Sequence, residues 1–383
     1  RPPLARAVRF TSPQPTMTSD STPGRIARLK QWLLDELRHL STVHPSTRSW
    51  QMPLAAALAS GLPLLVGAYF GHMDYGLASS LGGMVFLYLP NTPLHHRMVF
   101  LMACAFAMTS CYALGLMSHF APVLLVPVLI FITTLVTMLS RFYGLGAPGS
   151  LFFVMAAAIG TYMPIEVPQV PLMVGLIAMG CLLAFMIAFF YSLHAVRVRA
   201  PAPVPAKPAT DFDFVIFESV VIGVFVGLAL GVAQLLQMHK PYWVPVSCLA
   251  VIQGSTLRAV WTKQLHRVVG TGGGLVLASG LLMLPLNPWG LACTMMTLSL
   301  IIEVLVVRNY AAAVVFITPL TILLAEAAAL GHGAVSELIG ARFLDTVLGC
   351  AVGLLGALCM HRPRFRAVLG AWMRRLIPAR LAP

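Results

Sequence analysis

Residues Lys240–Ser255 read KPYWVPVSCLAVIQGS, and this stretch decides how the rest of the chain is interpreted. An aromatic pair, Tyr242 and Trp243, opens it, and Pro245 interrupts the apolar run that follows. Aromatic residues are enriched at membrane–water interfaces, and a proline in an apolar helix frees backbone groups that protein or water must cover. We therefore expect a short, broken membrane segment at about 242–257.

A glycine cluster, RVVGTGGG, follows at Arg267–Gly274. Gly270 and Gly274 are four residues apart, a spacing that suits close packing of two helices. The cluster is not a phosphate-binding loop, because it lacks the Lys-Ser/Thr ending and has no strand before it. With no nucleotide motif elsewhere, we do not expect the chain to be an ATPase on its own.

The composition is that of a membrane protein. Of the 383 residues, 58% are hydrophobic and 10% are charged, and the mean hydropathy is +0.86. A soluble core of this size would not bury so much apolar surface. We therefore predict an all-α polytopic membrane protein.

Charge and cysteine usage exclude several other classes. The formal net charge is +13, but the basic residues punctuate apolar segments instead of gathering on a polar surface, so we do not expect nucleic acid binding. The seven cysteines form no CxxC pair, the eleven histidines have no metal-ligand spacing, and no Ser/His/Asp or Cys/His constellation stands out. We predict no metal site, no cofactor and no enzymatic activity.

Apolar segments follow one another after Trp50, and several are shorter than the ~20 residues that a straight crossing needs. We expect about twelve transmembrane helices, of which the short ones are broken or tilted. The approximate segments are 52–70, 76–90, 98–118, 120–140, 145–163, 170–193, 214–236, 242–257, 265–285, 288–307, 310–330 and 337–360.

These segments divide the chain into five parts. Residues 1–50 form an N-terminal segment with a basic amphipathic helix at 25–40, which suits either the inner membrane surface or a cap on the loops. The remaining parts are a first six-helix membrane repeat at 51–193, a cytoplasmic linker at 194–213, a second six-helix repeat at 214–360 and a basic cytoplasmic tail at 361–383.

The distribution of lysine and arginine predicts the orientation. Almost all of them, including Arg97, Arg141 and Arg267, fall on the side of the N-terminus and the even-numbered loops. Lys240 falls on the opposite side, and Arg342 lies within the last segment. Because cytoplasmic loops carry the excess of positive charge, we expect both termini in the cytoplasm.

An internal repeat supports two copies of six helices. Tyr75 and Tyr242 are separated by 167 residues (242 − 75), and the same separation relates Arg141 to Arg308 and Tyr143 to Tyr310. Because six is even, the two copies share one orientation, and we expect a pseudo-twofold axis along the membrane normal.

Charged residues inside apolar segments are the best candidates for a functional site, because each costs at least ~2.5 kcal/mol unless it is paired or solvated. All of them lie in the second copy. Arg342 and Asp345 share one helix face, and Glu326 lies on the preceding helix. They form either a static ion network or a site where Arg342 attracts a substrate carboxylate while a carboxyl group exchanges a proton. The candidates are Glu218, Glu303, Arg308, Glu326, Arg342 and Asp345.

Each remaining candidate has two interpretations. Arg308 and Tyr310, near the inner face after Glu303, either receive an anionic substrate or anchor a positive-inside loop. Glu218 lies on the substrate and proton pathway or reaches water from its helix start. Tyr242 and Trp243 either stack against an aromatic acid or belong to an interfacial belt.

Four stretches resemble the membrane module of the fusaric acid resistance family, the bacterial aromatic-acid exporters that are related to the plant aluminium-activated malate transporters. They are the two opening stretches together with RNYAAAVVFITPLTILL (Arg308–Leu324) and ARFLDTVLG (Ala341–Gly349). The resemblance covers about 214–360 and implies export of organic anions. Unlike larger exporters of this type, the chain has no linker or tail long enough to fold alone.

Two transport functions follow from these observations. The first is a proton-coupled secondary efflux transporter of small organic anions, aromatic or other weak carboxylic acids, in the bacterial inner membrane. The alternative is a channel-like organic-anion conduit without proton coupling. A non-transporting membrane module is a third hypothesis. The expected partners are the anion, protons and the lipid bilayer, and a homo-oligomer and a periplasmic adaptor protein are compatible with the sequence.

Overall fold

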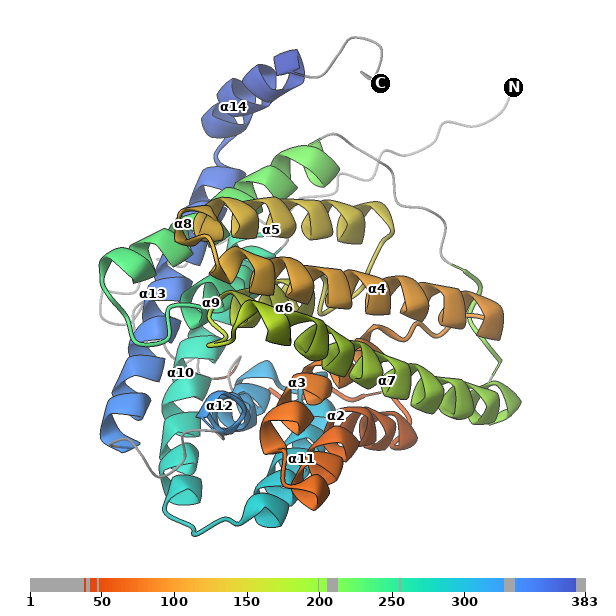
Figure 1. The fold of residues 1–383 in the computed structure, drawn as a ribbon. Coiled ribbons are helices and arrows are strands. Elements are labelled where there is room, and N and C mark those ends of the chain that lie inside the picture. The colour runs from red at the N-terminus through yellow and green to blue at the C-terminus, as the bar shows by residue number, and fades with distance from the viewer. Residues whose placement is uncertain are drawn as a thin grey trace, which may run out of the picture. The chain divides into compact units, whose positions relative to one another are not determined.

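The computed structural model describes residues 38, 42–46, 48–198, 200–204, 213–254, 256–326 and 335–376. Contacts within the chain separate residues 1–41 from residues 42–383, and the description below concerns the second unit. The amphipathic helix expected at 25–40 and much of the expected linker lie outside the described residues. Every regular element among the described residues is a helix, which confirms the all-α fold (Figure 1).

The first half holds six helices at the expected segments, three of which have short helical turns attached. They are α2 (Gln51–Phe70), α3 (Met73–Gly83) with η1 (Met84–Tyr88), α4 (Leu94–His119), η2 (Pro122–Leu124) with α5 (Leu125–Phe142), α6 (Leu151–Thr161), and η3 (Val167–Gln169) with α7 (Val170–Val198).

The second half repeats this order and adds one helix. Its elements are η4 (Asp213–Phe217) with α8 (Glu218–Leu235), α9 (Trp243–Ile252), α10 (Leu257–Leu282), α11 (Pro288–Leu305), α12 (Tyr310–Glu326), α13 (Val335–His361) and α14 (Pro363–Leu376). We did not expect α14 from the sequence. Its amphipathic, basic residues form a helix because it packs against α13 and η4 instead of standing alone.

Eight of the described helices are long and apolar enough to cross a membrane. Apart from the terminal α14, the described helices that are not are α3, α6, α9 and α12, which are the second and fifth helices of each half. A helix of 10 residues such as α9 spans only about 15 Å, half of a ~30 Å hydrocarbon core. The short segments that we expected are therefore present, at equivalent places in the two halves.

The two halves also share a pattern of helix packing. In the first half α3 contacts α2 and α7, and α4 contacts α6 and α7; in the second half α9 contacts α8 and α13, and α10 contacts α12 and α13. Between the halves, α5 packs on α8 as α11 packs on α2. In these pairs, each helix of the first half thus makes the same contacts as the helix six places later in the chain, for example α3 and α9. These shared contacts support the internal repeat.

Helix α9 lies in the core of the second half, and all ten of its residues are buried. Glycines let α13 approach it. A Cβ atom at Gly353 would lie 2.8 Å from the Cys248 carbonyl oxygen, and one at Gly349 would collide with the Val244 carbonyl oxygen. The close approach fixes which face of α13 meets α9.

The glycine cluster of α10 has the packing role that we expected. A Cβ atom at Gly270 would lie 2.7 Å from the Ala311 carbonyl oxygen, and one at Gly274 would lie 2.6 Å from Cβ of Thr318. Both neighbours belong to α12. Helices α10 and α12 therefore touch along backbone surfaces, with α13 beside α10 (Figure 1).

Two local predictions were wrong. Pro245 does not break a helix, because it lies in the first turn of α9, where backbone N–H groups have no intrahelical acceptor to lose. The segment before the linker does not end at 193, because α7 continues to Val198.

Candidate functional site

The Arg342 guanidinium group is the centre of the candidate site. Arg342 lies in α13, and it is buried. Its Cζ atom lies 3.9 Å from the centroid of the Trp243 ring of α9, and Nη2 donates a hydrogen bond to Oγ1 of Thr321 in α12 at 3.2 Å. Among the described residues, its Nε and Nη1 atoms have no hydrogen-bond partner. A buried guanidinium with free N–H groups is a donor surface for a carboxylate.

Asp345 lies one helical turn further along α13 and is also buried, with 1% of its surface exposed. Within the described part of the chain its Oδ1 atom has no hydrogen-bond partner, and it forms no ion pair with Arg342. The Arg342 side chain lies over Trp243 instead, so the two side chains do not close the ion network that we considered from the sequence. Glu326 is the last residue of α12, and its side chain falls outside the described part of the structure.

Arg267 is a site residue that we did not select from the sequence, where we counted it among the basic residues of the cytoplasmic side. Helix α10 begins at Leu257, because the Thr256 hydroxyl caps it by accepting a hydrogen bond from the Ala259 N–H group at 3.1 Å. This early start carries Arg267 into the third turn of the helix, where it is buried. The threonine cap is the signal in the sequence that would have placed it there.

The Arg267 side chain reaches the same two short helices as Arg342. Its Nη2 atom donates to Oγ of Ser247 in α9 at 3.2 Å, and Nη1 donates to the hydroxyl of Tyr310 in α12 at 3.3 Å. Ser247 is one helical turn from Trp243, so the two guanidinium groups approach α9 one turn apart. Among the described residues, Nε of Arg267 has no hydrogen-bond partner.

We call these residues the central arginine cluster. The charges of Arg267 and Asp345 both act on the Arg342 guanidinium group. Among the described residues, two buried guanidinium groups accompany one buried carboxyl group, and this excess of positive charge favours an anionic ligand. The cluster consists of Trp243, Ser247, Arg267, Tyr310, Thr321, Arg342 and Asp345.

Aromatic rings extend the cluster towards the first half. The rings of Tyr242 and Trp243 lie 5.2 Å apart, and those of Tyr242 and Tyr162 lie 5.9 Å apart. The Tyr162 hydroxyl accepts a hydrogen bond from the Gln234 side chain of α8 at 2.7 Å. Tyr242 and Trp243 are both buried, which favours the interpretation as site residues over that of a lipid-facing belt.

Two predicted candidates lie elsewhere. Glu303, in α11, is buried and forms an ion pair with Arg48 at 3.8 Å. Arg308 is exposed between α11 and α12, and its carbonyl oxygen accepts a hydrogen bond from the His44 N–H group at 2.8 Å. Both residues therefore contact the segment that precedes α2, and neither belongs to the central arginine cluster.

Glu218 belongs to a separate ion network. It forms ion pairs with Arg141 at the end of α5 and with Arg366 of α14, the latter at 3.5 Å. Arg141 also donates to the Phe214 carbonyl oxygen at 2.8 Å. These contacts join both halves and α14, so Glu218 has a structural role here rather than the exposed position that we also considered.

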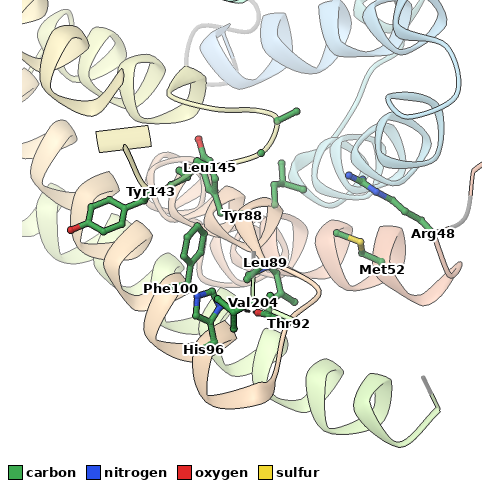
Figure 2. A pocket seen from close by; sticks show the side chains of 15 residues that line it. Arg48, Met52, Tyr88, Leu89, Thr92, His96, Phe100, Tyr143, Leu145 and Val204 are labelled. Carbon is green, nitrogen blue, oxygen red and sulfur yellow. Dashed lines mark hydrogen bonds between the residues drawn. The ribbon is translucent and has the colours of Figure 1, made fainter. Parts of the chain in front are cut away.

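A cavity of about 400 Å³ lies in the first half (Figure 2). Its wall includes the aromatic side chains of Tyr88, Phe100 and Tyr143 together with His96, and Arg48 lies at its edge. The cavity could not be expected from the sequence, because loops and helix ends that are far apart in the chain form it. In the part of the chain that the structure describes, no three His, Cys, Asp or Glu side chains gather closely enough to bind a metal ion.

Comparison with known proteins agrees with this architecture. Residues 228–356 match the fusaric acid resistance protein-like family. The uncharacterized membrane protein YvaC of Bacillus subtilis (strain 168) is similar over 88% of this chain and 77% of its own length, with 20% identical residues. No solved structure matches. All residues of the central arginine cluster fall within the range that is similar to this family, and the chain is a polytopic membrane protein.

Proposed function

We propose that the chain is a secondary exporter of small organic anions, with aromatic and other weak carboxylic acids as its substrates and the proton gradient as its driving force. One observation carries the proposal: a buried guanidinium group, Arg342, lies on the face of Trp243 with two nitrogen atoms free of partners among the described residues. A carboxylate satisfies those donors, and an aromatic ring attached to it finds the Trp243 and Tyr242 rings nearby.

The residues around Arg342 favour both the binding and the release of an anionic substrate. Arg267 adds a second positive charge, while Asp345 brings a negative charge that competes with the substrate for Arg342. Because Arg342 acts electrostatically on both a substrate carboxylate and the nearby Asp345 carboxyl group, the proton occupancy of Asp345 depends on whether substrate is bound. Glu326, at the end of the helix that carries Thr321, is a second candidate for the proton. This linkage is the basis on which we propose proton coupling.

The central arginine cluster is built on the short helices α9 and α12, which are packed among longer helices. Substrate sites of secondary transporters form where helices are discontinuous at membrane depth, because irregular backbone there must line protein or a water-filled cavity. Because the lysine and arginine residues of the sequence fall almost entirely on one side of the expected helices, we propose a bacterial inner-membrane location with cytoplasmic termini.

The first test removes the charge of Arg342. Arg342→Gln removes the charge and shortens the side chain but keeps a hydrogen-bonding group, and we expect efflux of benzoate from cells to fall by about 10-fold or more, as for loss of a charged hydrogen bond of ~1.5–3 kcal/mol. Arg308→Gln is the matched control, since Arg308 is exposed and outside the cluster. Equal efflux by both variants at equal membrane abundance would remove Arg342 from the substrate site.

A further inference from the structure

The cavity of the first half and the central arginine cluster occupy equivalent places in the internal repeat. Two residues of the cavity wall, His96 and Phe100, lie in α4, and Arg267 of the cluster lies in the corresponding helix α10, which begins and ends 163 residues further on (257 − 94 and 282 − 119). By this offset Phe100 corresponds to Lys263 (263 − 100 = 163), whose Nζ atom lies 5.7 Å from the centroid of the Tyr310 ring. The second half thus has charged side chains where the first half has a hollow with aromatic walls.

The walls of the cavity are held in place by their own contacts. The Tyr88 ring stacks on Phe153 at 4.6 Å, and its hydroxyl donates to the Gly149 carbonyl oxygen at 2.8 Å. The His96 ring stacks on Phe100 at 5.8 Å, and its Nδ1 atom lies 2.9 Å from Oγ1 of Thr92. Aromatic faces that are already ordered bind a flat ring at little cost in conformational entropy.

A cation stands at one end of this hollow. Figure 2 shows Arg48 and Met52 on one side of Tyr88 and Phe100, and Tyr143 on the other. Arg48 is held by Glu303 through an ion pair of 3.8 Å, and about a third of its side chain is exposed. The contact of 3.8 Å is longer than a hydrogen bond, so Arg48 keeps N–H donors that an incoming carboxylate can use in competition with Glu303.

We propose that this cavity is a second binding site for a single-ring aromatic carboxylate, with the ring between Tyr88, Phe100 and Tyr143 and the carboxylate on Arg48. A volume of about 400 Å³ lies at the lower end of small-molecule sites, which suits one ring and excludes larger conjugates. This inference rests on the proposed function, since it names the substrate class of the same transporter, and it adds a site in the half of the chain that lacks the central arginine cluster.

The linker between the halves offers a way to block the site without altering a helix. Val204 lines the cavity, and its segment is held by a hydrogen bond from the Ala202 N–H group to the Asn91 carbonyl oxygen at 3.0 Å. Val204→Trp places a large side chain at the cavity, and Val204→Ala is its matched control.

The experiment is photolabelling of the full chain in detergent with 4-azidobenzoate, followed by mass spectrometry of the labelled peptides. We expect saturable labelling of peptides that contain Phe100 or Tyr143. Arg48→Gln should weaken it by about 10-fold, Val204→Trp should abolish it, and Val204→Ala should leave it in place. Glu303→Gln should strengthen it by about 2- to 5-fold, because Arg48 loses its competing partner.

The outcomes separate this site from the central one. Labelling of Phe100 or Tyr143 peptides that persists in Arg342→Gln supports two independent sites. Labelling confined to peptides with Trp243 overturns the second site and leaves the proposed function standing. Labelling at neither place overturns both, and labelling of the cavity that ignores Arg48→Gln and Val204→Trp overturns the assignment of the carboxylate to Arg48.

Discussion

At the scale of single residues, the environment of Arg342 explains why a charge can be kept inside an apolar bundle. A guanidinium group is weakly hydrated and planar, so it lies on the Trp243 face with little loss of solvation, and Thr321 satisfies one nitrogen. Lysine offers neither the plane nor the fork of donors. The arrangement therefore stabilises the charge while leaving donors for a ligand.

The stacking contact makes a prediction of its own. Trp243→Leu removes the ring but keeps an apolar side chain, and it leaves the Arg342 charge buried without its partner. We expect a loss of about 2–4 kcal/mol in stability, seen as a lower midpoint temperature of unfolding in detergent. Trp243→Phe keeps an aromatic face and should recover most of the difference. If the two variants unfold at the same temperature, the stacking contact does not stabilise the guanidinium group.

The same residues show where sequence reasoning ends. Arg342, Asp345, Tyr242 and Trp243 could be selected because charge and aromatic pairs in apolar segments are costly enough to demand an explanation. Their contacts could not be predicted. The hydrogen bond to Thr321, for example, depends on which side of α12 faces α13, and the packing of the helices determines that. Arg267 was not selected because it lies at the edge of the expected segment 265–285, whereas the helix begins at Leu257, after the cap at Thr256, and so carries Arg267 into its third turn.

At the scale of elements, the glycines of α13 set the position of the site. Gly349 lies seven residues after Arg342, two turns along the same face, and it meets the backbone of α9 at Val244. A side chain there would push α13 away from α9 and lift Arg342 from Trp243. Close packing of this kind needs small residues, because no hydrophobic effect drives helices together in lipid.

A pair of alanine variants on α13 tests this role. We expect Gly349→Ala to destabilise the protein by about 1–3 kcal/mol through overpacking, and to weaken benzoate binding as Arg342 shifts. Gly340→Ala is the control on the same helix, because a Cβ atom there meets no neighbour within 4 Å. Its higher helix propensity should leave stability unchanged or slightly raised. The measurement is thermal unfolding in detergent, and equal behaviour of the two variants would contradict the packing argument.

At the scale of the whole molecule, the internal repeat was visible as a recurring separation of tyrosines and arginines, and the helix contacts of the two halves support it. The sequence also predicted the short second helix of each half, since the apolar segments at 76–90 and 242–257 are too brief to cross, but the fifth helices are shorter than the segments expected at 145–163 and 310–330. It could not predict the cavity between α4, η1 and the loop after α5, because that hollow depends on which loops meet across the fold. The halves therefore share a framework and differ in the chemistry they hold.

The most direct test of the account is uptake of labelled benzoate into proteoliposomes whose lumen is more acidic than the outside. Passive diffusion of the neutral acid does not concentrate benzoate on the acidic side of a membrane. Accumulation in the lumen therefore requires the protein to exchange the benzoate anion for protons. We predict accumulation with the wild-type protein that disappears when the gradient is dissipated and in Arg342→Gln. Uptake that follows an imposed voltage and ignores the pH gradient would contradict proton coupling and favour a channel-like conduit, and no uptake of any aromatic or aliphatic carboxylate would contradict the proposed function itself.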